Sequence, residues 1–194
     1  MAHTDVQRAS FLPAGGFLVE ARPHSALRTL LGISCGCAVM ALAAQVRVPV
    51  PGTDVPMTLQ SFVLVLVGLL LPARSAGGAM VLYAGLGAAG FPVFAPGSLG
   101  FAGPTGGYLA GFAPAAWLIA LLRGSSNRIP RCVAAGAAGL LLLFAIALAW
   151  RAVWFNGDVI LALTTGFVPF AGKAAVELVL AAMLAAAIRR RSRT

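Results

Sequence analysis

The residues of this 194-residue chain that could do chemistry are few, and the most informative pair is Lys173 and Glu177. They are four positions apart in an apolar stretch, so on a helix they would lie on one face. If that stretch crosses a membrane, placing ionisable side chains there is costly, which marks them as candidates for a functional site. The alternative is a structural ion pair between helices, with Arg151 or Asp158 as further partners.

The residues needed for catalysis or metal binding are scarce. The two histidines, His3 and His24, lie near the N-terminus, and the three cysteines match no zinc-ligand or redox spacing. Five residues, instead of four, separate Gly166 from Gly172, so the segment before Lys173 does not match a phosphate-binding loop. We therefore expect that the protein is not an enzyme and that it has no catalytic residues, no bound metal and no resident cofactor. Uphill transport would then need energy from a partner or an ion gradient.

The elements that must position these residues follow from the hydropathy pattern. Hydrophobic residues make up 60% of the chain and charged residues only 10%, whereas soluble domains carry about 25% charged residues. Six largely uncharged intervals approach the length of about 20 residues that crosses a bilayer as a helix. The predicted spans are residues 27–46, 57–73, 75–90, 106–122, 132–151 and 170–188. The sequence thus predicts an all-α membrane protein, a compact bundle of six transmembrane helices in one domain.

The charged residues predict how this bundle is oriented. Lys and Arg number 14 against 5 Asp and Glu, which gives a net charge of +9. Eleven arginines fall on one side of the six-span arrangement, and Arg47, Arg151 and Lys173 fall on the other. By the positive-inside rule both termini lie in the cytoplasm of a cell, so the basic excess indicates a lipid bilayer and not a nucleic acid as the partner. The expected divisions are a cytoplasmic leader at 1–26, the membrane domain at 27–188 and a basic cytoplasmic tail at 189–194.

Three connections on the outer side are rich in proline. Residues 47–56, 90–106 and 151–169 hold seven of the 12 prolines, which fix φ and make loops stiff. Simple rigid turns would explain any one of them, but three on one face predict a lidded, outward-facing pocket. The expected substrate-binding residues are Thr58, Gln60, Tyr83, Thr105, Tyr108, Lys173 and Glu177.

Small residues recur at helical spacing in two places, where they let helix backbones approach closely. For Gly103, Gly107 and Gly111 we expect packing between helices of the chain itself. The first span carries a second stripe, which is either internal packing or a docking face for another membrane subunit. The residues of that stripe are Gly32, Gly36, Cys37 and Ala41.

Four segments together resemble one family. They are 48–62 (VPVPGTDVPMTLQSF), 90–94 (GFPVF), 103–112 (GPTGGYLAGF) and 166–170 (GFVPF). This pattern is similar to BioY, the substrate-binding S component of the energy-coupling-factor transporters for biotin. The resemblance covers about residues 27–188 and implies a compact six-helix bundle with both termini inside. It also implies that biotin binds from outside and that a transmembrane coupling protein and a pair of cytoplasmic ATPases are partners.

The resemblance assigns roles to two further regions. The loop after the first helix helps to bind biotin in the family, which here implies a lid made of Pro51, Gly52, Thr53, Asp54, Val55 and Pro56. Small residues on the first helix take part in docking to the coupling protein, which favours that role for the stripe on the first span.

The chain departs from the family in the last helix. Members typically follow the PF dipeptide with an Asp and, three residues on, a Lys that address the ureido ring of biotin; the matching positions here are Ala174 and Glu177. A ureido ring needs an acceptor for its N–H groups and a donor for its carbonyl, which Glu177 and Lys173 could supply in reversed order. Candidates for the biotin carboxylate are Thr58, Gln60, Tyr108, Arg47 or a helix N-terminus.

Other functions stay open beside biotin capture. Within the same class, the chain could bind another small vitamin or a biotin precursor. From a different class, it could be a membrane assembly subunit without a ligand, although the proline-rich loops and the intramembrane charged pair argue against that. An intramembrane enzyme is disfavoured because histidine and paired acids are lacking at membrane depth.

Overall fold

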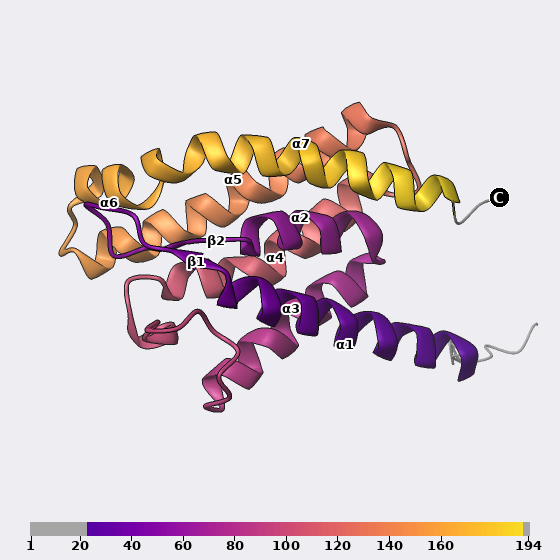
Figure 1. The fold of residues 1–194 in the computed structure, drawn as a ribbon, viewed down its shortest axis with the longest axis horizontal. Coiled ribbons are helices and arrows are strands. Elements are labelled where there is room, and N and C mark those ends of the chain that lie inside the picture. The colour runs from indigo at the N-terminus through magenta and orange to yellow at the C-terminus, as the bar shows by residue number, and fades with distance from the viewer. Residues whose placement is uncertain (1–22, 192–194) are drawn as a thin grey trace, which may run out of the picture.

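The computed structural model describes residues 23–191 as a helical bundle with two very short strands (Figure 1). Most of the predicted leader (1–26) and the end of the predicted tail (189–194) lie outside the described residues. The described elements are α1 (Pro23–Gln45), β1 (Arg47–Val48), β2 (Met57–Thr58), α2 (Gln60–Leu70), α3 (Ala73–Ala88), the 3₁₀ helix η1 (Gly100–Ala102), α4 (Gly106–Arg123), α5 (Ile129–Trp154), α6 (Val159–Gly166) and α7 (Val168–Arg191).

Four of the described helices, α1, α4, α5 and α7, are long and apolar enough to cross a membrane. The prediction of six spans is therefore met in part, because α2 has only 11 residues and α3 only 16. The span predicted at 57–73 is shorter than expected for two reasons. Met57 and Thr58 form β2, which pairs antiparallel with β1, and α2 ends at Leu70, just before Pro72.

Helix α6 lies in a segment that we predicted to be a connection between two spans. Helix α5 continues past Arg151 to Trp154, and the chain then turns through Asn156 (φ 53°) and Gly157 (φ 92°). Asp158 caps α6, since its carboxylate accepts a hydrogen bond of 2.8 Å from the backbone N–H of Leu161. We predicted that the span ends at Arg151 because we interpreted this arginine as a boundary residue. In the structure Arg151 is buried instead.

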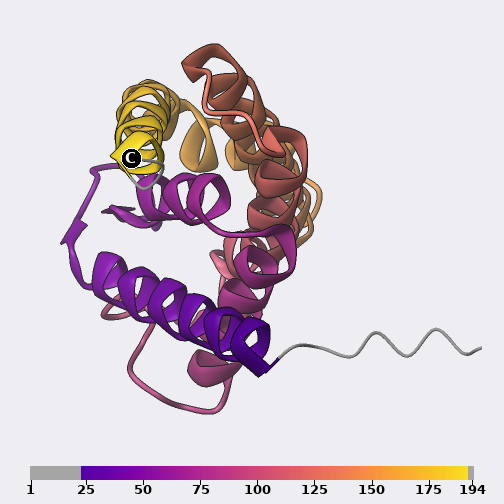
Figure 2. The same cartoon turned by 90° about the vertical axis from the view of Figure 1, so that its right-hand side faces the viewer.

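Helix α2 is the centre of the bundle. Viewed along the helices, it lies between α1 and α7 (Figure 2), and it packs on α1, α4, α5 and α7. Its buried side chains are all aliphatic: Val63, Leu64, Val65, Val67 and Leu69. A helix of 11 residues can hold this position because longer helices surround it.

Among the described helices, α4 and α5 have the most extensive contact with each other, and glycines allow it. A Cβ on Gly107 would lie 2.4 Å from the Cβ of Trp150, and one on Gly111 would lie 2.8 Å from Cδ1 of Leu143. Two of the three glycines assigned to internal helix packing therefore have that role. The third, Gly103, lies before α4, where its carbonyl accepts a hydrogen bond of 3.0 Å from Trp150 Nε1.

The small-residue stripe of α1 is partly turned inward. Gly36 is buried, and a Cβ there would lie 2.9 Å from the Cβ of Ala79 in α3. Cys37 is also buried, whereas Gly32 and Ala41 are half-buried. In this conformation the stripe packs mainly within the chain, and only its half-buried members are accessible to another subunit.

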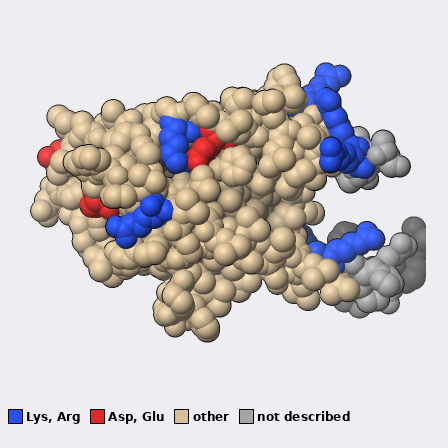
Figure 3. Space-filling view, viewed as in Figure 1, with Lys and Arg blue, Asp and Glu red and all other residues tan. Residues whose placement is uncertain are grey.

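Lys and Arg side chains gather at the end of the bundle where α1 begins and α7 ends (Figures 1 and 3). Two arginines bind carbonyls at the C-terminal end of α2. Arg123 Nη2 donates to the carbonyl of Leu71 (3.3 Å), and Arg189 Nη1 donates to that of Leu69 (3.1 Å). Cations at a helix C-terminus are electrostatically favourable, so this end of the bundle is held by basic side chains from α4 and α7.

Candidate ligand-binding site

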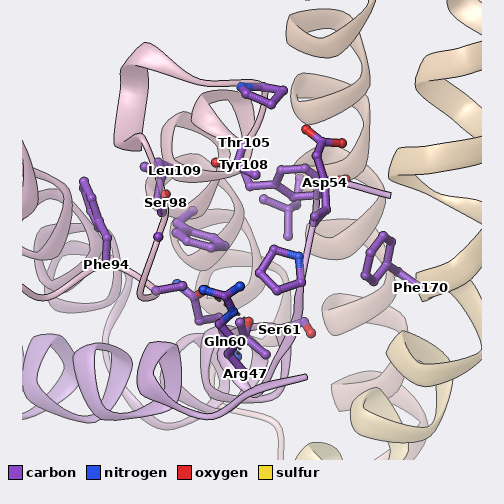
Figure 4. A pocket seen from close by; sticks show the side chains of 18 of the residues that line it. Arg47, Asp54, Gln60, Ser61, Phe94, Ser98, Thr105, Tyr108, Leu109 and Phe170 are labelled. Carbon is purple, nitrogen blue, oxygen red and sulfur yellow. Dashed lines mark hydrogen bonds between the residues drawn. The ribbon is translucent and has the colours of Figure 1, made fainter. Parts of the chain in front are cut away.

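A cavity of about 260 Å³ lies between the beginnings of α2, α4 and α7, at the opposite end from the basic cluster. Two connections cover it, which we call the first loop (residues 49–56) and the second loop (residues 89–105). Figure 4 shows side chains from both loops and from α2 and α4 directed toward a common space. The polar residues that line it are Arg47, Asp54, Thr58, Gln60, Ser61, Tyr83, Ser98, Thr105, Tyr108 and Lys173.

One polar group on the cavity wall is centred on Gln60, the first residue of α2. Its side-chain oxygen accepts a hydrogen bond from Thr58 Oγ1 (3.0 Å), and its Nε2 donates to the hydroxyl of Tyr83 (3.0 Å). Tyr83 is fully buried in α3. Residues from three successive elements, β2, α2 and α3, thus fix the orientation of one amide group at the cavity.

A second polar group joins α7 to α2. Lys173 Nζ lies 2.7 Å from Glu177 Oε2, and the side chains are 23% and 10% exposed. Ser61 of α2 connects the two, since its hydroxyl accepts from Lys173 Nζ (3.1 Å) and donates to the same Glu177 oxygen (2.5 Å). Lys173 and Ser61 line the cavity, whereas Glu177 lies behind them, so the ammonium and the hydroxyl are the groups presented to a ligand.

The first loop is attached to α5 by an ion pair and to α6 by a hydrogen bond. Asp54 receives hydrogen bonds from both terminal nitrogens of Arg151 (2.8 and 3.3 Å). The same guanidinium donates to Thr165 Oγ1 (2.6 Å), and Thr53 Oγ1 donates to the backbone carbonyl of Thr165 (2.6 Å). The bidentate geometry is the strongest arrangement of an arginine with a carboxylate, so the loop is held firmly at this point.

The second loop is held mainly through its backbone. The carbonyl of Phe94 accepts from Gln45 Nε2 (3.3 Å), and the carbonyl of Pro96 accepts from Arg47 Nη1. Trp150 of α5 holds the far end of the loop at Gly103.

Aromatic side chains form a large part of the apolar lining. Tyr83 and Phe94 meet edge to face with their ring centroids 5.4 Å apart, and Phe112 of α4 packs against Tyr83. Phe144 and Phe170 line the cavity from α5 and α7. An apolar cavity with a few fixed polar groups is the usual architecture of a small-molecule site. Within residues 23–191, no three His, Cys, Asp or Glu side chains come close enough to hold a metal ion.

The structure brings most of the residues chosen from the sequence to this cavity. Of the seven expected substrate-binding residues, all but Glu177 line it. Of the six expected lid residues, Asp54, Val55 and Pro56 line it, whereas Pro51, Gly52 and Thr53 do not. Sequence reasoning missed Ser61 and the phenylalanines, because their place depends on how α2, α4, α5 and α7 pack.

The structure shows the partners of the charged pair. Lys173 and Glu177 bind each other and Ser61, while Arg151 pairs with Asp54 and Asp158 caps α6.

These features define a class: a multi-pass membrane protein with a small cavity, lined by polar and aromatic side chains, at one end. Residues 13–194 match the profile of the BioY family, and the chain belongs to this family. It is 33% identical over 167 residues to "Biotin transporter BioY" of Thermotoga maritima, covering 84% of this chain and 97% of the relative. It is 36% identical to "Probable biotin transporter BioY" of Pyrococcus horikoshii, covering 76% and 90%.

The fold is similar to that of a solved structure, the S component for biotin from an ECF-type ABC transporter. The TM-score is 0.79 at 18% sequence identity, and the alignment covers 87% of this chain and 94% of the other. The arrangement of the described helices is therefore one that a solved structure also has.

Proposed function

We propose that this chain is the biotin-binding S component of an energy-coupling-factor uptake transporter. The observation that carries the proposal is family membership over nearly the whole chain, with a relative named as a biotin transporter matched over 97% of its length. The cavity supports it, because it is small and combines aromatic side chains with fixed polar groups.

Each part of biotin has a chemically suitable partner in the cavity. Lys173 Nζ donates to the ureido carbonyl, and the oxygens of Ser61 and Gln60 accept from the ureido N–H groups. Arg47 lies on the lining between the two loops and pairs with the carboxylate. The aromatic side chains surround the fused rings and the alkyl tail. Glu177 acts on the ligand indirectly, by fixing Lys173 and Ser61.

The proposed orientation of the chain in the membrane rests on the cluster of basic residues at the end of the bundle where α1 begins and α7 ends. In the proposed arrangement the chain crosses the membrane six times, both termini lie in the cytoplasm and the cavity faces outward. A coupling protein and a pair of ATPases supply the energy, and the accessible part of α1, which includes Gly32 and Ala41, contributes to docking. A fusion of a cytoplasm-specific reporter to the C-terminus should be active, and an inactive fusion would reverse the orientation.

A second candidate ligand is another small vitamin or a biotin precursor. The observation in its favour is Ala174, a buried methyl group on the cavity wall where the resemblance leads one to expect an acid. A ligand with fewer N–H donors than a ureido ring would need fewer acceptors there.

A thermal-unfolding titration of the purified chain separates the candidates. Biotin should raise the unfolding temperature in a saturable manner, because a ligand that binds only the folded state stabilises it. Other vitamins and biotin precursors in the same panel should not. No shift with biotin at saturating concentration would contradict the proposal, and a shift with a different vitamin alone would replace it by the second candidate.

A further inference from the structure

Arg151 is the largest fully buried side chain of the described residues, and the groups around it are unusual for a membrane helix. Its side chain is 0% exposed, and its guanidinium carbon lies 5.0 Å from the centre of the Phe155 ring. A Cβ on Gly166 would lie only 2.7 Å from its Nε, so α6 approaches it closely. The guanidinium is thus enclosed by α5, α6 and the first loop.

The counter-charge for this buried cation comes from a loop. The described acids are Asp54, Asp158 and Glu177, and only Asp54 binds Arg151. Its carboxylate is 40% exposed, so it stands at the surface of the contact. A buried charge that loses its partner is strongly unfavourable. Moving the first loop away would separate Arg151 from the acid that it binds, whereas Asp54 is already partly hydrated.

The same loop residues that reach Arg151 also cover the cavity. Asp54 lines it together with the next two residues, Val55 and Pro56, and Val55 is only 8% exposed. Thr53, one residue earlier, donates to the carbonyl of Thr165. Ligand exchange past the first loop must therefore break the contacts of Thr53 and Asp54 with α5 and α6.

We infer that Arg151 is a positioning residue for ligand binding: by pairing with Asp54 it holds the first loop closed over the cavity and sets how long a bound ligand stays. It does not touch the ligand. The inference rests on the proposed function for the identity of the ligand, and it assigns to one buried arginine the control of release.

The test measures release of labelled biotin from the purified full chain. Asp54→Asn keeps the size of the side chain but removes its charge, and it should speed dissociation by about tenfold or more, with the number of sites per folded chain unchanged. Asp158→Asn is the matched control, because that acid only caps α6, and its dissociation rate should equal that of the wild type. Equal rates for Asp54→Asn and the wild type would overturn the inference. A merely structural role would instead lower the number of sites and leave the rate unaltered.

A cross-link provides a second, independent test. Thr53→Cys and Thr165→Cys, in a background without the three native cysteines, are joined by a short cleavable cross-linker after biotin has bound. Dissociation should stop or slow by at least about tenfold, as expected for a closed binding site, and cleavage should restore it. Release at the uncross-linked rate from the joined form would overturn the inference. If the wild type retains no biotin at all, the proposed function fails, which is a different outcome from wild-type retention with unchanged release.

Discussion

Two ion pairs flank the cavity, and they differ in what they connect. Lys173 and Glu177 lie one turn apart on α7, so the rigid helix keeps them together. Arg151 and Asp54 are 97 residues apart and join a helix to a loop. The first pair can contribute to recognition without separating, whereas the second breaks whenever the loop moves.

The two ion pairs also differ in how deeply their partners are buried. In the α7 pair both side chains are mostly buried, at 23% and 10% exposure, and Ser61 binds both. In the other pair Arg151 is fully buried and Asp54 is 40% exposed. The two ion pairs therefore have different roles. The pair whose partners are both mostly buried is fixed, and the pair with one exposed partner can open.

The largest effect is expected from breaking the fixed pair. Lys173→Met leaves Glu177 buried with only Ser61 as a partner, which should destabilise the folded chain by about 3 kcal/mol. Lys173→Met combined with Glu177→Leu should recover most of the stability, because apolar side chains replace both charges. Thermal unfolding in detergent measures both variants. An unchanged midpoint for the single variant would show that the pair is solvated and not fixed.

An intermediate effect is expected at a glycine beside the pair that can open. Gly166→Ala adds a Cβ 2.7 Å from Arg151 Nε and 3.2 Å from the Tyr108 hydroxyl, so the guanidinium must shift, at an estimated cost of about 2 kcal/mol. Gly172→Ala, next to Lys173, is the matched control, because its Cβ would meet no atom within 4 Å. The first variant should release biotin faster and the second should not. Equal release rates in these two variants would remove the distinction between the pairs.

The smallest effect is expected from the neutral hydrogen bond of the first loop. Thr53→Val removes the donor to the Thr165 carbonyl but keeps the ion pair, and it should destabilise the closed loop by about 1 kcal/mol. Thr164→Val is a suitable control, because that hydroxyl binds carbonyls of its own helix. Stopped-flow release of labelled biotin should detect a change of a few fold for Thr53→Val alone. A change as large as that of Asp54→Asn would mean that the ion pair is not the main attachment.

Most residues that were chosen from local features of the sequence line the cavity, although their role in binding stays a prediction. Thr58 and Gln60 follow Pro56 closely and Thr105 follows Pro104, each near the start of an apolar segment, and such positions can be found from hydropathy and composition alone. The spacing of Lys173 and Glu177 likewise predicted that they share a face of α7.

The features that could not be predicted from the sequence depend on contacts between distant segments. The partner of Arg151 lies 97 residues away, and Ser61 gains its role only because α2 packs against α7. Helix α6 is eight residues long, too short for a criterion based on crossing the bilayer. The length of α2 was overestimated because hydrophobicity does not distinguish Met57 and Thr58 in a strand from residues in a helix.

The most direct test of the central claim, that the cavity below the first loop binds biotin, is equilibrium binding of labelled biotin to a variant with a filled cavity. Ala174→Phe places a ring in the space that the buried Ala174 lines, and Val176→Phe adds the same ring on an exposed position of α7. We expect one saturable site per chain for the wild type and for Val176→Phe, and no measurable site for folded Ala174→Phe. Wild-type binding by Ala174→Phe would contradict the account and place the ligand elsewhere.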